Sequence, residues 1–203
     1  MARSPLVLLA KEKLPSANVK ELVAFSQTSP GGLSYGSFGN GSAAHLAAEM
    51  FRAATGAKIV HVPYRGSAPA LTDLLGGTLD MMFDVLVTGL PHVQAGTLKA
   101  FAVTSQTRSN LLPNVPTMIE AGVPGYDAST WFGLLAPAGT SPEIVTLLSN
   151  ALDGALKQPE FQAAMNQQGA EVTGGTPEDF RRFMRSEFEK WGQAAAVAGV
   201  RPN

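Results

Sequence analysis

A glycine-rich segment, residues 34–42, has the clearest capacity for chemistry in this chain. Its three glycines allow sharp turns and close approach of a ligand. The apolar residues after it recur at helical spacing, which predicts a helix from about Gly41 to Thr55 with Asn40 as its N-cap. The first amides of a helix have no partner within the helix, and that end of the dipole is positive. A carboxylate or phosphate would therefore bind there. The candidate ligand-binding residues are Ser37, Gly39, Asn40, Gly41 and Ser42.

The same segment is equally consistent with a simple turn in which Asn40 and Ser42 only cap a helix. Three further candidates, Arg65, Asp84 and Trp131, have similar alternatives. Arg65 and Asp84 each follow a predicted strand, at the sheet edge where open α/β folds bind ligands. Arg65 could instead form a surface salt bridge, Asp84 could cap the next helix, and Trp131 could be a core aromatic rather than part of a cleft wall.

Two catalytic motifs match only in part. Gly39-x-Gly41-x-x-Ala44 fits the dinucleotide fingerprint, but no acidic residue for a ribose follows the next strand. Arg65 could contact a 2′-phosphate, so an NADP-binding oxidoreductase-like domain stays open as an alternative. The run from Tyr35 to Gly39 resembles a nucleophile elbow, but Tyr35 stands where its first glycine is required.

The three histidines, His45, His61 and His92, do not have the helical spacing of metal ligands. We expect His45 to lie beside Glu49 on the polar face of its helix, solvated or capping, and the other two to be structural. No base–nucleophile pair is apparent among the candidate residues. Neutral donors, one arginine and a helix N-terminus favour anion recognition over catalysis, with no metal and no cofactor.

Strands and helices alternate from Leu33 to Val103, which predicts an α/β fold with a doubly wound parallel sheet. Leu6–Leu9 and Trp131–Ala136 are predicted to be further strands. The last third is rich in helices, with Ser141 as one N-cap and Thr176 with Asp179 as a capping box.

The composition narrows the class of protein. The 203 residues include 45% hydrophobic and 15% charged residues and carry a net charge of −1, which indicates a folded chain without a nucleic-acid-binding surface. The absence of cysteine excludes disulfides and thiolate catalysis. The apolar run Leu6–Ala10 is too short for a signal peptide core or a membrane span, so we expect no direct membrane insertion.

Six runs occur in the order of one known family: Tyr35–Ser42 with His45–Leu46, His61–Gly66 with Ala68–Ala70, Asp73–Gly77 with Asp80 and Met82–Asp84, Leu98–Ser105, Pro113–Thr117 with Glu120–Gly122, and Trp131–Gly139. Together they resemble the Bug/TctC family, the extracytoplasmic solute-binding proteins of tripartite tricarboxylate transporters. The resemblance covers nearly the whole chain.

The resemblance implies a periplasmic-binding-protein-like fold (type II, Venus flytrap) that closes on a small organic carboxylate. Such a protein is periplasmic and non-catalytic, and delivers its ligand to the membrane components of the transporter. In the family, a loop of each lobe holds the ligand, and Ser37–Ser42 matches the loop of lobe two. The implied organisation is a crossover strand from lobe one (1–14), lobe two with the carboxylate loop (15–104), and a return crossover with the C-terminal helices of lobe one (105–203).

The sequence departs from the family pattern at its start. Family members begin with a signal peptide and the first half of lobe one, and neither matches this chain. We therefore expect lobe two to be complete, lobe one to be partial, and half of the ligand cleft to be missing. The strand Trp131–Ala136 and the C-terminal helices would expose apolar surface unless a partner covers it. A truncated reading frame, a domain fragment without ligand-binding activity and a self-associating chain all stay open.

Overall fold

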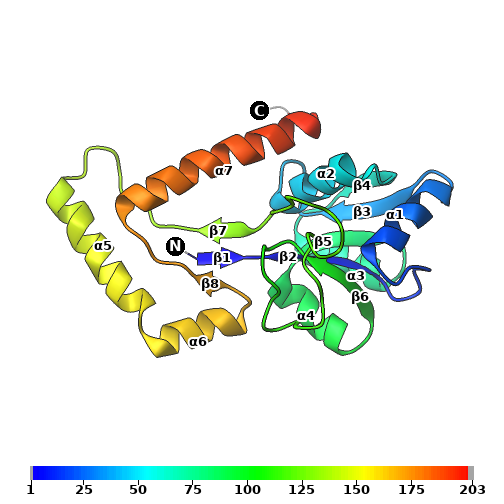
Figure 1. The fold of residues 1–203 in the computed structure, drawn as a ribbon, viewed down its shortest axis with the longest axis horizontal. Helices are drawn as coiled ribbons and strands as arrows, with labels where there is room; N and C mark the ends of the chain where they lie inside the picture. The colour runs from blue at the N-terminus through cyan, green and yellow to red at the C-terminus, as the bar shows by residue number, and fades with distance from the viewer. Residues whose placement is uncertain (1, 201–203) are drawn as a thin grey trace.

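The computed structural model describes residues 2–200 and contains two sheets joined end to end (Figure 1). A five-stranded sheet has the order β4-β3-β5-β2-β6, and a three-stranded sheet has the order β7-β1-β8. The strands are β1 (Ala2–Ser4), β2 (Leu6–Lys11), β3 (Leu33–Ser37), β4 (Ile59–Pro63), β5 (Met81–Val85), β6 (Leu98–Val103), β7 (Thr130–Phe132) and β8 (Glu171–Val172).

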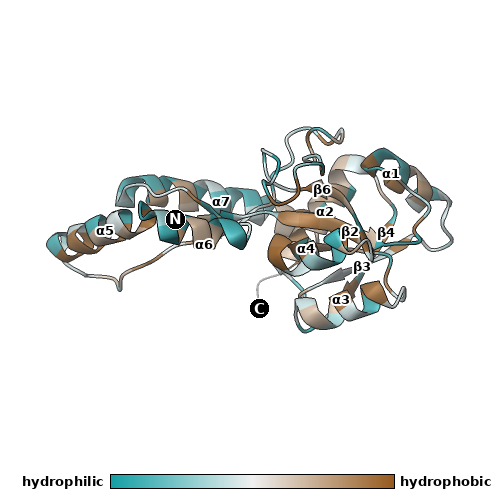
Figure 2. Cartoon of the chain, turned by 90° about the horizontal axis from the view of Figure 1, so that it is seen from below, coloured by the Kyte–Doolittle hydropathy of each residue, from teal (hydrophilic) through white to brown (hydrophobic). Residues whose placement is uncertain are grey.

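Helices flank both sheets. They are α1 (Val19–Thr28), α2 (Ala43–Thr55), α3 (Ser67–Leu75), α4 (Leu86–Gln94), α5 (Pro142–Leu156), α6 (Pro159–Gln167) and α7 (Pro177–Val197). We call the five-stranded sheet with α1–α4 the large lobe, and the three-stranded sheet with α5–α7 the small lobe. Figure 2 shows the small lobe as a narrow extension of the wider large lobe. Within residues 2–200, no helix is long and apolar enough to cross a bilayer.

The large-lobe sheet is mixed rather than wholly parallel. Strand β3 runs parallel to β4 and β5, as predicted, but β2 lies antiparallel between β5 and β6. The reason is the path of the chain. Strand β2 enters the large lobe directly from β1 of the small lobe, at the edge where β3 to β6 end, and so runs opposite to them.

Strand β2 is buried on both faces, as its unbroken apolar sequence predicts. Leu6 and Leu8 point into one core, which α1 and α2 complete. Val7 and Leu9 point into a second core, which α3 and α4 complete. The large lobe is therefore doubly wound, with helices on both faces of its sheet.

The small lobe differs from expectation at β7. The predicted strand Trp131–Ala136 ends at Phe132, because within the described residues β7 pairs only with β1. The residues beyond it leave the sheet and are exposed. Leu134 and Leu135 are 74% and 73% exposed, and Leu147 of α5 is 68% exposed. The expected exposure of apolar surface on this part of the chain is thus confirmed.

Two connections and one helix join the lobes. The first connection runs from β1 into β2, and the second returns from β6 through residues 104–129 to β7. Buried Thr104 holds them together: its Oγ1 accepts from the Leu6 amide at 2.8 Å and lies 3.3 Å from the Ala128 carbonyl. Helix α7 packs against α2 (Figure 1).

Thr104→Val tests this junction. Valine has a similar shape but leaves the buried Leu6 amide without its side-chain acceptor, so the free energy of unfolding should fall by about 1–3 kcal/mol. Urea denaturation followed by circular dichroism measures the change. Thr107→Val, at an exposed position of the same connection, is the matched control and should change stability by less than about 0.5 kcal/mol. Equal effects of the two variants would contradict the role of Thr104.

Candidate functional site

The glycine-rich loop joins β3 to α2, as predicted, but the cap of the helix lies elsewhere. Ser42, not Asn40, is the N-cap: its Oγ accepts from the His45 amide at 3.3 Å and donates to the Gly39 carbonyl at 2.8 Å. Gly39 and Gly41 have φ values of 121° and 74°, where side chains are strained. The left-handed backbone at Gly41 prevents the helix from starting before Ala43.

The loop directs some amides inward and leaves others free. The Gly39 amide donates to Ser37 Oγ at 3.1 Å, and the Gly41 amide donates to His45 Nδ1 at 3.0 Å. Within residues 2–200, the amides of Asn40, Ala43 and Ala44 donate to no other group. Three free N–H groups at the positive end of α2 form a site suited to a small anion.

Ser37 lies inside this loop rather than on its surface. The residue is fully buried, and its Oγ lies 2.7 Å from His61 Nε2 and 3.1 Å from the Gly39 carbonyl oxygen. Its hydroxyl is therefore engaged on every side. Asn40, Gly41 and Arg65 are exposed, so the structure places these three candidates where a solute can reach them.

Three stacked rings support the loop from below. His45 lies over His61 with ring centroids 3.9 Å apart and planes 7° apart, and the Tyr35 ring lies beside this pair, 4.9 Å from His61 and 6.4 Å from His45. We expected His45 to be either solvated or capping. The solvated position is wrong, because the residue is only 6% exposed. The capping role is confirmed, because His45 accepts a hydrogen bond from the Gly41 amide of the loop. Burial lowers the pKa of His45, and burial with the neighbouring His45 lowers the pKa of His61 to about 4.

A buried network continues from the stack into α2. The Tyr35 hydroxyl donates to Glu49 Oε1 at 2.6 Å, and Arg52 donates to Glu49 Oε2 through Nε at 2.8 Å. Burial, and then the hydrogen bond to Glu49, raises the pKa of Tyr35. Each polar group of this network has a partner, which is what makes its burial tolerable.

The loops after β3, β4 and β5 meet at one edge of the sheet, as the sequence predicts. The Tyr64 amide donates to the Ser37 carbonyl at 3.1 Å, and Ser67 Oγ donates to Asp84 Oδ1 at 2.7 Å. Arg65 lies between these two contacts, in the loop after β4. Within the described part of the chain its guanidinium forms no hydrogen bond or ion pair. It is thus an exposed cation on the loop that contacts the glycine-rich loop.

Asp84 connects three elements at this edge. It is fully buried and accepts from Ser67, from Thr88 Oγ1 at 2.6 Å and from the Val85 amide at 2.9 Å. Its expected alternative role as N-cap of α4 is wrong, because Val85 holds that position. Burial raises the pKa of Asp84 despite these hydrogen bonds. The carboxylate therefore holds α3 and α4 in place and does not face solvent.

The structure places Trp131 far from the glycine-rich loop. Its ring packs edge-on against Phe180 and Phe183 at the start of α7, with centroids 5.8 and 5.4 Å away. Val200, just beyond the other end of α7, lies 3.5 Å from where a Cβ on Gly41 would be. At the helical rise of 1.5 Å per residue, the stretch from Phe183 to the end of α7 measures roughly 20 Å.

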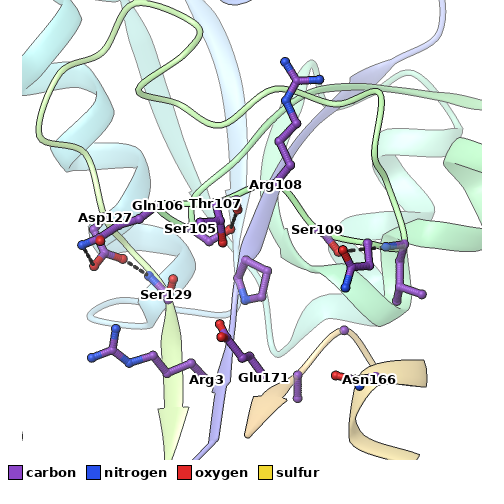
Figure 3. A pocket seen from close by; sticks show the side chains of 15 residues that line it. Arg3, Ser105, Gln106, Thr107, Arg108, Ser109, Asp127, Ser129, Asn166 and Glu171 are labelled. Atoms are coloured by element: carbon purple, nitrogen blue, oxygen red, sulfur yellow. Dashed lines mark hydrogen bonds between the residues drawn. The ribbon is translucent and has the colours of Figure 1, made fainter. Parts of the chain in front are cut away.

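A polar groove between the lobes was missed by sequence reasoning (Figure 3). It encloses about 640 Å³ beside the end of β6. Its charged lining residues are Arg3, Arg108, Asp127 and Glu171. The rule that ligand-binding loops follow the strands at one sheet edge, which predicted the loops after β3–β5, would also have found part of this groove. Residues 105–111 follow β6 at the same edge. Within residues 2–200, no group of three or more His, Asp or Glu side chains could hold a metal ion.

Comparison with known proteins identifies the family. The family described as tripartite tricarboxylate transporter family receptor (TctC) matches residues 1–199. The chain belongs to this family. Protein BugT of Bordetella pertussis is 38% identical over 197 residues, which are 97% of this chain and 60% of BugT. This TctC-family chain therefore spans less than two thirds of the length of that relative.

Solved structures agree with this membership. R. palustris Rpa4515 with adipate has a TM-score of 0.89 at 38% identity and is matched over 100% of this chain and 68% of its own. MatC (Rpa3494) from Rhodopseudomonas palustris with bound malate has a TM-score of 0.80 at 29% identity, over 95% of this chain and 67% of its own. The fold is that of periplasmic solute-binding proteins, and the family comprises transport receptors rather than enzymes.

Asp84→Ala tests whether the buried carboxylate holds this edge together. The donors on Ser67 and Val85 would lose their acceptor and Thr88 would keep only the Val85 carbonyl, so the free energy of unfolding should fall by about 1–3 kcal/mol. Asp84→Asn keeps one acceptor oxygen and should cost less. Asp153→Ala, which removes a partly exposed carboxylate paired with Lys157, is the control and should cost less than about 1 kcal/mol.

The same variants have a signed pH dependence. Because burial raises the pKa of Asp84, the folded chain keeps this proton to a higher pH than the unfolded chain. The stability of the wild type relative to Asp84→Asn should therefore fall as the pH rises from about 4, the ordinary aspartate value. Urea denaturation at several pH values measures it. If the stability of the wild type relative to Asp84→Asn grew with pH, this result would contradict a buried Asp84 carboxyl with a raised pKa.

Proposed function

We propose that this chain supplies one side of a binding site for a small organic carboxylate, such as a di- or tricarboxylate. The complete protein would deliver this solute, from the periplasm, to the membrane components of a tripartite tricarboxylate transporter. The observation that carries the proposal is that the amides of Asn40, Ala43 and Ala44, at the N-terminus of α2, donate to no group among residues 2–200. The role is binding without catalysis.

The predicted site residues take different parts in this proposal. The amides of Asn40, Ala43 and Ala44 and the Arg65 guanidinium would contact the ligand. Gly39, Gly41 and Ser42 would shape the loop that presents these amides. Ser37 and Asp84 are buried and engaged, so they would act by fixing the loops. Trp131 would not contact a ligand at this loop, since it lies about 20 Å away along α7.

Charge and the solved relatives support a carboxylate over other solutes. Three amides and Arg65, which has no partner among the described residues, compensate a negative group with planar acceptor oxygens. Rpa4515 with adipate and MatC with malate are structures of relatives with bound dicarboxylates. A second carboxylate of such a ligand would extend away from α2, toward the part of the relatives that this chain does not span.

Calorimetry with adipate, malate and a tricarboxylate tests the proposal. It should be run on this chain and on a fusion that adds the part of BugT that this chain does not match. We expect binding by the fusion and much weaker binding by this chain. Failure of the fusion, folded by circular dichroism, to bind any of a wide panel of carboxylates would refute the proposal. Thermal stabilisation by NADPH but not by carboxylates would instead favour the dinucleotide alternative, which Gly39-x-Gly41 and Arg65 leave open.

Arg65→Gln should weaken carboxylate binding by about tenfold, because a charge-assisted hydrogen bond contributes about 1.5–3 kcal/mol. The loss should shrink at high salt, since an exposed cation is screened. Lys58→Gln is the matched control. It removes the same charge just before β4, at the other end of the strand that Arg65 follows. Equal weakening by both variants would show a general charge effect and count against a contact at Arg65.

Self-association is a separate proposal that rests on the apolar surface of the small lobe. Leu147 and Leu148 of α5 are 68% and 55% exposed, and Leu134 and Leu135 of the same lobe are exposed as well. Leu147→Lys with Leu148→Lys should shift the chain toward monomer in multi-angle light scattering. Asn150→Lys, exposed on the same helix, is the control and should leave the mass unchanged. A monomeric wild-type chain at high concentration would rule this proposal out.

A further inference from the structure

We propose that His45 and His61 are positioning residues for the carboxylate loop, and that the loop keeps its binding geometry only while His45 is neutral. The inference rests on the proposed function for its consequence, but its structural part concerns the loop alone. It assigns a role to two rings, buried His45 and half-buried His61, that the ligand itself would not touch.

The hydrogen bond at Gly41 fixes the protonation state of His45. The Gly41 amide donates to His45 Nδ1 at 3.0 Å, so Nδ1 must carry a lone pair and the proton must sit on Nε2. A proton on Nδ1 would oppose the amide proton directly. Protonation of His45 therefore requires the Gly41 amide to turn away, and Gly41 lies between the free amides of Asn40 and Ala43.

His61 holds the other end of the loop and limits the charge of the stack. Its Nε2 lies 2.7 Å from Ser37 Oγ, which in turn accepts from the Gly39 amide. With ring centroids 3.9 Å apart, the two imidazoles cannot both be cations without strong repulsion. Gly39 and Gly41, the two turning points of the loop, thus depend on the same neutral pair.

The surrounding charges do not offset this requirement. Glu49 is the acidic group that acts on both rings, but it is engaged with Tyr35 and with Arg52. On α7, which packs against α2, Glu187 and Lys190 pair with each other. His45 also lies in the first turn of α2, where the helix dipole disfavours a cation.

The direction of the pH effect follows from burial. Burial lowers the pKa of both rings, to about 4 for His61, so the folded chain releases these protons more readily than the unfolded chain. The neutral stack is therefore complete at pH 7. The folded rings take up protons only as the pH falls through these lowered pKa values, below the ordinary histidine value of about 6.5, and the neutral stack is lost in that range. Acidification should open the loop and weaken carboxylate binding.

Nitrogen-15 NMR of the complete chain tests the structural part without a ligand. We expect imidazole spectra to show His45 as the Nε2–H tautomer, and the Gly41 amide shift to titrate together with the His45 ring below pH 6.5. His45→Asn places Oδ1 where Nδ1 stood and cannot titrate, so the Gly41 titration should disappear while the loop shifts stay close to those of the wild type. His92→Asn, outside the stack, is the control and should leave the titration intact. An Nδ1–H tautomer, or a Gly41 amide that ignores His45, would overturn the inference.

Adipate titrations on the BugT fusion at a series of pH values from 7.5 down to about 4, the lowered pKa of His61, test the consequence. Relative to His45→Asn, the wild type should lose affinity about fivefold to tenfold more on acidification, the effect of one hydrogen bond. His45→Leu, which offers no acceptor, should bind more weakly than His45→Asn at every pH value. Identical pH dependence of wild type and His45→Asn would refute the positioning role. If no variant binds adipate at pH 7.5, the proposed function fails for this ligand, while the NMR result still decides the inference.

Discussion

The parallel alignment of β3, β4 and β5 is the constraint on which the candidate site depends. Because parallel strands end at the same edge, the loops after them must meet there. The contacts from Tyr64 to Ser37 and from Ser67 to Asp84 join them into one surface. The antiparallel β2 does not disturb this arrangement, since it enters between β5 and β6 and brings the small lobe to the same edge.

Buried polar groups give this edge its shape. Beneath the loop, Tyr35, Glu49 and Arg52 satisfy one another, and Ser37 satisfies His61 and Gly39. A buried polar group without a partner costs about 1–3 kcal/mol, so each of these contacts excludes alternative loop conformations. The free amides of the loop are thus held in place before any ligand arrives, which lowers the ordering cost of binding.

Local patterns predicted the elements better than they predicted the site. The helix after the loop, the capping box at Thr176 and the meeting of the three loops follow from periodicity, cap chemistry and strand direction. The cap at Ser42 did not follow, because Asn40 and Ser42 are both good caps and the backbone of Gly41 decides between them. The burial of His45 did not follow either, since it depends on His61 from a distant strand. The parallel sheet was predicted from residues 33–103 alone. The antiparallel place of β2 in that sheet was not predicted, because the direction of β2 is set by its entry from the small lobe.

The magnitude of the available interactions explains why one loop is not a sufficient binding site. Three amides and one arginine that contact a carboxylate contribute about 1.5–3 kcal/mol each at best. Association alone costs about 4–15 kcal/mol in lost translational and rotational freedom. The free energy of these contacts thus exceeds the cost of association by little, so one side of a cleft binds weakly even when it is well ordered. The chain spans 60% of BugT, and the relatives that hold adipate and malate are longer as well. A tight carboxylate site therefore requires contacts from a second surface, and the glycine-rich loop sets where on the large lobe that surface must close.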